Sequence, residues 1–128
     1  MDKSSGIERR RHRRVRTQFS AVCNMQTPPG FRTPIKENEI IARMADLSES
    51  GMAILTNYDI PPQSRLSSRF TLVNLGAKDA DRYKLIETEG EVCYNSAEDS
   101  LHRLGVCFTR ISETDRTAIA NFTSGRVA

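Results

Sequence analysis

The sequence predicts a mainly β protein: a six-stranded antiparallel β-barrel with a C-terminal α-helix and a flexible basic leader at the N-terminus. Short stretches of alternating polar and apolar residues, separated by turn-forming residues, recur along most of the chain. The hydrophobic period changes from two to about 3.6 only near the end. Arginines are concentrated ahead of the first alternating stretch, and 128 residues fit one domain.

Six strands are expected, at residues 15–25, 39–47, 52–56, 65–75, 84–94 and 103–109. The first has an apolar face at period two, made of Val15, Thr17, Phe19, Ala21 and Cys23. The second has apolar residues on both faces, so the alternation does not assign its inner face. The clearest strand is 84–94, where three glutamates alternate with a second face and predict one wet side. That second face consists of Ile86, Thr88, Gly90, Val92 and Tyr94.

Turns and loops are expected between these strands, and a helix after the last one. Residues 27–38 contain a Pro-Pro-Gly break and are expected to form a loop or an excursion with an edge pairing. Residues 48–51 and 95–100 are expected to form turns, and 76–82 a charged loop. Ser112 is a candidate N-cap with an acid three residues later. Ala118, Ile119 and Phe122 then form one helical stripe, and Gly125 closes the helix.

The domain is expected over residues 8–123, with a leader at 8–16, the helix at 111–123 and tails at 1–7 and 124–128. The longest apolar run is far shorter than the roughly twenty residues of a membrane span. The N-terminus has no apolar signal-peptide region. The three cysteines lack zinc-site spacing, so we expect reduced, small apolar packing residues in a cytoplasmic protein, and no metal site.

The leader carries the positive charge of the chain. Residues 1–16 hold seven Lys/Arg and two Asp/Glu, a net of +5, whereas residues 17–128 hold twelve and fourteen, a net of −2. Six of the nine residues at 8–16 are arginine, and none is lysine. The planar guanidinium binds phosphate and the O6/N7 edge of guanine with paired hydrogen bonds. By composition alone, however, an arginine run is most often a solvated tail or a nonspecific nucleic-acid patch.

Two separated motifs add to this pattern. Arg10-Arg11-x-x-Arg14 precedes the first strand, and Asp46-x-Ser48-x-x-Gly51 begins at the end of the second, where the strand becomes a turn. A late Arg-Leu-Gly-Val-Cys-Phe strand at 103–108 then leads to Ile-Ser-Glu-Thr-Asp-Arg at 111–116. In these features the chain resembles the PilZ domain family. The resemblance implies a bacterial receptor for cyclic di-GMP (c-di-GMP), without catalysis, in which the arginine segment closes over the nucleotide on a six-stranded barrel.

The expected ligand-binding residues come from these motifs and their neighbours: Arg9, Arg10, Arg11, Arg14, Asp46, Ser48, Gly51 and Gly105. The motif arginines suit base edges, base faces and phosphates. Asp46 and Ser48 suit the N1/N2 edge of guanine. Gly51 is expected to have a positive φ and to let a base lie against the backbone. Gly105 is expected to act similarly, and the resemblance implies that Arg9 affects how many nucleotides bind.

Two other functions are compatible with the sequence. One is a protein–protein adaptor of the same fold that binds no nucleotide. The other is nonspecific nucleic-acid binding by the leader, which lacks interleaved aromatic residues for stacking. An enzyme is not expected, because no nucleophile turn, phosphate-cradling glycine loop or metal-ligand cluster is present. We expect c-di-GMP as the ligand, no cofactor and a protein partner; the downstream process, stoichiometry and oligomeric state stay open.

Overall fold

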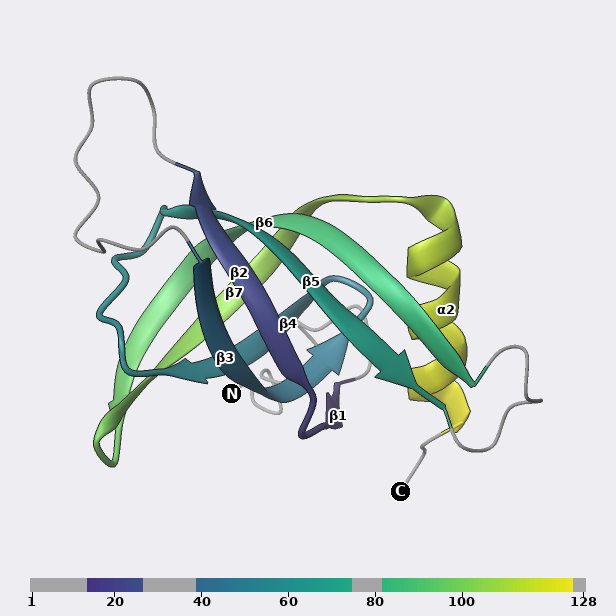
Figure 1. The fold of residues 1–128 in the computed structure, drawn as a ribbon, viewed down its shortest axis with the longest axis horizontal. Coiled ribbons are helices and arrows are strands. Elements are labelled where there is room, and N and C mark those ends of the chain that lie inside the picture. Colours follow the sequence, from purple (N-terminus) through teal and green to yellow (C-terminus); the bar gives the residue numbers. More distant parts are fainter. Residues whose placement is uncertain (1–13, 27–38, 75–81, 126–128) are drawn as a thin grey trace, which may run out of the picture.

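The computed structural model describes residues 14–26, 39–74 and 82–125 (Figure 1). Seven strands and one helix lie in these ranges. They are β1 (Val15–Arg16), β2 (Ser20–Gln26), β3 (Glu39–Ser48), β4 (Gly51–Thr56), β5 (Arg65–Val73), β6 (Tyr83–Glu98), β7 (Leu101–Ile111) and α2 (Glu113–Gly125).

The sheet closes on itself and forms the expected six-stranded antiparallel barrel. The strands follow the order β1-β3-β2-β5-β6-β7-β4, and an additional β3–β4 pairing completes the ring. β1 is an extra short strand that pairs with the end of β3. Closure leaves no free edge among the six barrel strands, which satisfies their backbone hydrogen-bonding groups.

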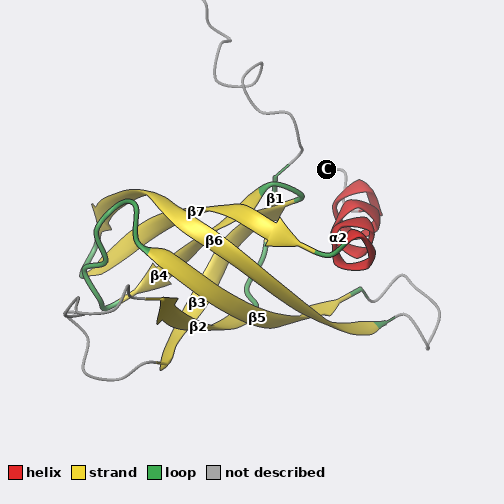
Figure 2. Ribbon diagram, turned by 90° about the horizontal axis from the view of Figure 1, so that it is seen from above, coloured by secondary structure: helices red, strands yellow, loops and turns green. Residues whose placement is uncertain are grey.

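The helix α2 lies at one end of the barrel (Figures 1 and 2). Ser112 caps it as expected, because its Oγ accepts a hydrogen bond from the backbone N–H of Asp115 at 3.1 Å. Ile119 and Phe122 are buried and join the barrel core. Burying side chains of this size stabilises the fold by about 1.5–3 kcal/mol each, so the apolar stripe holds the helix in place.

The barrel interior is lined by the apolar faces of all six strands. The most deeply buried large side chains there are Ile40, Met44, Leu47, Met52, Ile54, Leu66, Ile86, Val92 and Leu104. In the strand expected at residues 65–75, Leu66, Phe70 and Leu72 are all buried.

A β-bulge explains why the inner face of β3 was ambiguous. Ile40, Ala42 and Met44 point inward, and Ile41 is 73% exposed. The register with β4 shifts between Met44 and Asp46, so that Leu47 is buried next. One extra residue in a strand reverses the alternation beyond it, which places apolar residues on both faces of the sequence pattern.

Two expectations about strand bounds and one about a strand face were wrong. Residues 15–25 do not form one strand, because the chain leaves regular pairing between β1 and β2. Residues 95–100 are not a turn: β6 continues to Glu98, and a tight hairpin places Asp99 at φ 52°. Tyr94 does not share the inner face, because a bulge between Val92 and Tyr94 turns its side chain outward, where it is 41% exposed.

The cysteine expectation holds for one residue of three. Cys23 is a free, buried thiol in the barrel core. Cys93 and Cys107 are not reduced packing residues: they form a disulfide between β6 and β7 on the exposed face of the sheet, with Cα atoms 6.3 Å apart. Cys93 is the extra residue of a bulge in β6, and it is bonded to Cys107 of β7, which pairs with Glu91; the linear sequence contains no sign of that register.

Candidate functional site

A cavity of 880 Å³ lies where β1 and the following segment meet β3, the start of β7 and the helix. It is lined by Arg16, Thr17, Gln18, Phe19, Arg43, Met44, Ala45, Asp46, Leu55, Glu98, Arg103 and Phe122. The rings of Phe19 and Phe122 lie 5.6 Å apart between centroids and form its apolar side. Its size lies within the range of about 300–1,000 Å³ that small-molecule sites occupy.

The bulge in β3 presents Asp46 to this cavity. If the regular alternation ran unbroken through Ala45, Asp46 would continue the inward series of Ala42 and Met44. The reversed alternation instead turns Leu47 inward, and Asp46 lines the cavity with a side chain that is 15% exposed. Bulges commonly re-aim a side chain next to a functional site, and this one does so for the first residue of the second motif.

The Asp46 carboxylate joins two arginines from opposite ends of the domain. Arg14 donates from Nη1 to Oδ1 at 2.8 Å, and Arg103 donates from Nη2 to Oδ2 at 2.9 Å. The three side chains are between 15% and 28% exposed, so solvent only partly screens these charge-assisted hydrogen bonds. The carboxylate therefore fixes the last arginine of the first motif against the barrel.

Arg103 is also held by its neighbours on the β6–β7 hairpin. Partial burial acts to lower the pKa of Arg103, but a hydrogen bond with the Tyr94 side chain and the nearby charges of Asp46 and Glu98 outweigh it. The pKa is therefore raised above its usual value. Glu98 lies 3.8 Å from the second terminal nitrogen of the guanidinium. Arg103 is thus a permanently charged group with a defined orientation on the cavity wall.

Ser48 and Gly51 shape the turn between β3 and β4. Ser48 is only 1% exposed; its Oγ accepts from the Ser50 N–H at 3.3 Å and donates to the Gly51 carbonyl at 3.4 Å. The φ of Gly51 lies outside the left-handed range, so the glycine does not have the left-handed conformation expected of it. The glycine is needed for another reason: a Cβ there would overlap the carbonyl oxygen of Val106 on β7.

Gly105 lies in register with the site but faces an aromatic ring. Asp46 pairs with Ala53 on β4, and Ala53 pairs with Gly105 on β7, so the three form one row across the sheet. A Cβ at Gly105 would overlap the ring of Tyr94. The glycine therefore lets Tyr94 lie flat on β7, close to Arg103.

Of the residues predicted from sequence, the structure brings Arg14 and Asp46 into contact. Arg9, Arg10 and Arg11 lie outside the described residues. Arginine and glutamate side chains that the sequence reasoning did not single out also line the cavity: Arg16, Arg43, Glu98 and Arg103. Arg103 stands two residues before Gly105, but only the strand register shows that it reaches Asp46.

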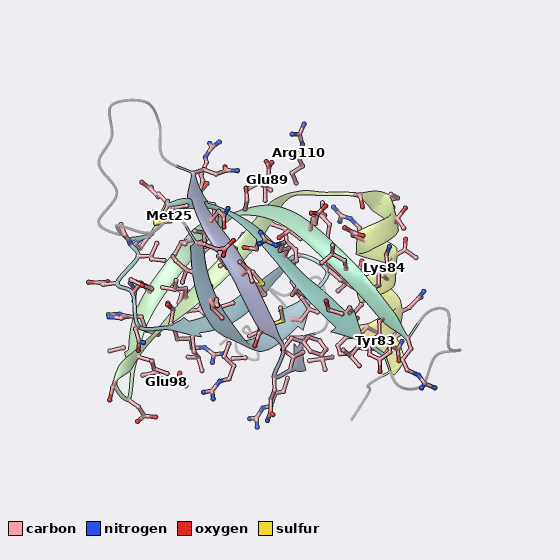
Figure 3. The ribbon with its side chains drawn as sticks, viewed as in Figure 1. Met25, Tyr83, Lys84, Glu89, Glu98 and Arg110 are labelled. Carbon is pink, nitrogen blue, oxygen red and sulfur yellow. A yellow bond between two sulfur atoms is a disulfide. The ribbon has the colours of Figure 1, made fainter. Side chains whose placement is uncertain are left out.

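A second, shallower hollow of 600 Å³ lies elsewhere on the barrel, over β5, β6 and the end of β7. Figure 3 shows Glu89 and Arg110, which line it, at the edge of the molecule opposite Glu98. Neither motif contributes to it. Among the described residues, no group of three or more His, Cys, Asp or Glu side chains is arranged to hold a metal ion.

Comparison with known families decides the identity of the fold. The model of the PilZ domain family matches residues 8–125. The chain belongs to the PilZ domain family. The match includes both motifs and the helix, in agreement with the resemblance seen in the sequence.

Solved structures similar to this PilZ domain confirm the fold. The inhibitor of motility MotI (DgrA) of Bacillus subtilis is 16% identical, with a TM-score of 0.72 over 92% of this chain and 51% of that one. YcgR of Escherichia coli in complex with c-di-GMP is 19% identical, with a TM-score of 0.63 over 91% and 45%. The PilZ domain of YcgR with c-di-GMP, also 19% identical, gives a TM-score of 0.57 over 91% and 90%.

This PilZ domain spans about half the length of the MotI and full YcgR chains. Among curated protein sequences, none matches it significantly. None of the helices in the described ranges has the length and apolarity to cross a membrane.

Proposed function

We propose that this PilZ domain is a bacterial, cytoplasmic receptor for c-di-GMP and binds the dinucleotide in the 880 Å³ cavity. One observation carries the proposal: Asp46 of the second motif holds Arg14 of the first motif at 2.8 Å beside that cavity. The two YcgR structures with c-di-GMP support the choice of ligand, since their domains share this fold.

The charge of the site suits a dinucleotide with two phosphates. Three arginines and two carboxylates line the cavity, a net of +1, and Arg14 beside it brings the total to +2. Two phosphate groups carry a charge of −2, so the site and the ligand neutralise each other. Guanidinium groups also pair with the O6/N7 edge of guanine and stack on its face.

The remaining motif residues complete the proposed site. Arg10 and Arg11 bind the nucleotide from the leader, and Arg9 affects the number of nucleotides bound. Ser48, Gly51 and Gly105 act through the shape of the wall, because each is fixed by packing or hydrogen bonds within the barrel. Binding changes the conformation of the leader, and a protein partner reads that change. In this proposal the domain binds and signals, and it catalyses no reaction.

Titration calorimetry with c-di-GMP tests the proposal. We expect micromolar or tighter affinity, about −8 kcal/mol or better. Arg14→Ala should weaken binding by about 1.5–3 kcal/mol, because it removes a charged hydrogen-bonding group. Arg110→Ala is the matched control: it removes the same charge from the edge of the barrel opposite Glu98. Equal losses in the two variants would mean that the cavity is not the binding site.

Asp46→Ala distinguishes binding at a specific site from nonspecific attraction to a basic surface. Removing a carboxylate makes the protein more basic, so a purely electrostatic interaction predicts tighter binding. The proposed site predicts weaker binding, because Arg14 and Arg103 both lose the group that orients them. Tighter binding of c-di-GMP by Asp46→Ala, with a similar gain for unrelated DNA, would favour the nonspecific alternative.

A further inference from the structure

The arginine and carboxylate on the cavity wall form a pair with unused hydrogen-bonding capacity. The two oxygens of Asp46 have about four acceptor positions, of which Arg14 and Arg103 occupy one each. Arg103 has five N–H donors, and Asp46 accepts from one of them. Both side chains line the same cavity and are partly exposed to it. A ligand can therefore meet an acceptor and a donor side by side.

This arrangement matches two adjoining edges of guanine. O6 and N7 are acceptors on the Hoogsteen edge, and the N1–H and N2–H donors follow beyond O6 on the Watson–Crick edge. A carboxylate suits the donors, and an adjacent guanidinium suits O6 and N7. Adenine presents an N6 amino donor where guanine has O6, so it would place a donor against the guanidinium.

The neighbours of Arg103 make this pairing favourable. The Glu98 carboxylate, 3.8 Å from a terminal nitrogen, and the nearby Tyr94 side chain flank the guanidinium on the side of the β6–β7 hairpin. Gly105 leaves room for the Tyr94 ring that does so. A side chain that is fixed before binding loses less conformational entropy when it contacts a ligand. Its raised pKa is consistent with a donor that keeps its proton throughout.

We infer that Arg103 is a ligand-binding residue that determines base specificity: with Asp46 it forms a guanine-reading pair, in which Asp46 accepts from N1/N2 and Arg103 donates to O6/N7. This inference rests on the proposed function and deepens it. Arg103 belongs to neither sequence motif, and it comes from the strand β7 at the far end of the chain.

The test is titration of wild type and Arg103 variants with c-di-GMP, with the adenine analogue c-di-AMP as the second ligand. Arg103→Ala should weaken c-di-GMP binding by about 10- to 100-fold, the value of a good bidentate contact to a base. Arg103→Lys keeps the charge but loses the planar fork, so it should weaken binding almost as much. Binding of c-di-AMP should change little, so the preference for guanine should fall with the c-di-GMP affinity.

Arg110→Ala is the control for charge, because it removes an arginine from the same strand on the opposite side of the barrel. The double variant Asp46→Ala/Arg103→Ala separates contact from positioning. If Arg103 touches the base, the double variant binds more weakly than Asp46→Ala alone. If Arg103 only orients the carboxylate, the two proteins bind alike. Thermal unfolding of each variant confirms that it is folded.

Three results would overturn the inference. Arg103→Lys could bind c-di-GMP as tightly as wild type, or Arg103→Ala could lose no more c-di-GMP affinity than Arg110→Ala. The third is that Arg103→Ala loses affinity equally for c-di-GMP and c-di-AMP. When c-di-AMP binds too weakly to titrate, the c-di-GMP affinities of Arg103→Lys and of Asp46→Ala/Arg103→Ala decide whether Arg103 contacts the base. Wild-type protein that fails to bind c-di-GMP would refute the proposed function itself. Wild-type binding that survives Arg103→Ala would refute the role of Arg103 alone.

Discussion

Replacing Gly51 by alanine should destabilise the barrel strongly. The added Cβ would overlap the Val106 carbonyl oxygen and would lie 3.3 Å from the Val106 carbonyl carbon and 3.4 Å from the Cys107 Cα. All three obstructing atoms are backbone atoms of β7, which is hydrogen-bonded on both sides, to β4 and to β6. Relieving the overlap requires a shift in one of these two strand pairings. We therefore expect the free energy of unfolding to fall by about 3 kcal/mol, near the top of the usual range for overpacking.

Gly105→Ala provides a matched comparison. Gly105 lies on β7, two residues before Cys107, which pairs with Gly51. Here the obstructing atoms belong to the Tyr94 ring, a side chain that is 41% exposed and can rotate towards solvent. Moving the ring gives up some of its packing against β7 but shifts no backbone hydrogen bond. The expected loss is therefore about 1 kcal/mol, the low end of the usual overpacking range.

Urea unfolding, followed by circular dichroism and analysed by linear extrapolation, gives both free energies of unfolding. A loss of about 3 kcal/mol is a large part of the roughly 5–15 kcal/mol that stabilises a domain. The reasoning is refuted if Gly51→Ala is as stable as wild type, or if it is less destabilised than Gly105→Ala. A stable Gly51→Ala that no longer binds c-di-GMP would show instead that the glycine serves the ligand directly.

Three further predictions concern the cysteines and the helix. Reduction of the Cys93–Cys107 disulfide, which closes a loop of 14 residues, should lower the free energy of unfolding by about 3 kcal/mol; urea unfolding with and without a dithiol reductant measures this, and unchanged midpoints would contradict it. Burial raises the pKa of the Cys23 thiol, more than the Ser68 hydrogen bond lowers it, so the folded protein should leave Cys23 unmodified by iodoacetamide at neutral pH. Mass spectrometry detects the label, and rapid labelling under native conditions would be the opposing result. Ser112→Ala removes the N-cap of α2 and should cost about 1 kcal/mol, whereas Ser112→Asp should cost little; a neutral alanine variant would contradict the capping role.

Where the alternation is regular, the sequence was sufficient to predict the fold. Along β6, the buried series Ile86, Thr88, Gly90 and Val92 follows the predicted face, and the Ser112 cap lies where predicted. Both signals are local, because period-two burial and helix capping depend on residues only a few positions apart.

Where a bulge interrupts a strand, the sequence was not sufficient. The shift around Ala45 reverses the alternation of β3 and exposes Asp46, and the shift after Val92 turns Tyr94 outward. Each bulge depends on how a strand meets its partner, which the strand's own residues do not encode in a simple pattern. The Cys93–Cys107 disulfide was missed for the same reason.

The residues of the candidate site show the same difference between local signals and strand register. Its two motifs are continuous in sequence and were identified, and the structure joins Arg14 to Asp46. Arg103 was missed, because it is 57 residues from Asp46 and reaches it only through the register of β3, β4 and β7. Residues that act together across a closed barrel are visible only once the ring of strand pairings is known.

The central claim is that c-di-GMP binds in the cavity between the Asp46 bulge and the helix. Mapping of backbone amide shifts by NMR during a c-di-GMP titration tests this most directly. The account predicts that the largest changes cluster at residues 16–19, 43–46 and around Arg103, while the second hollow around Thr88 stays unchanged. Saturable changes centred on that second hollow, or no changes at all, would contradict the account.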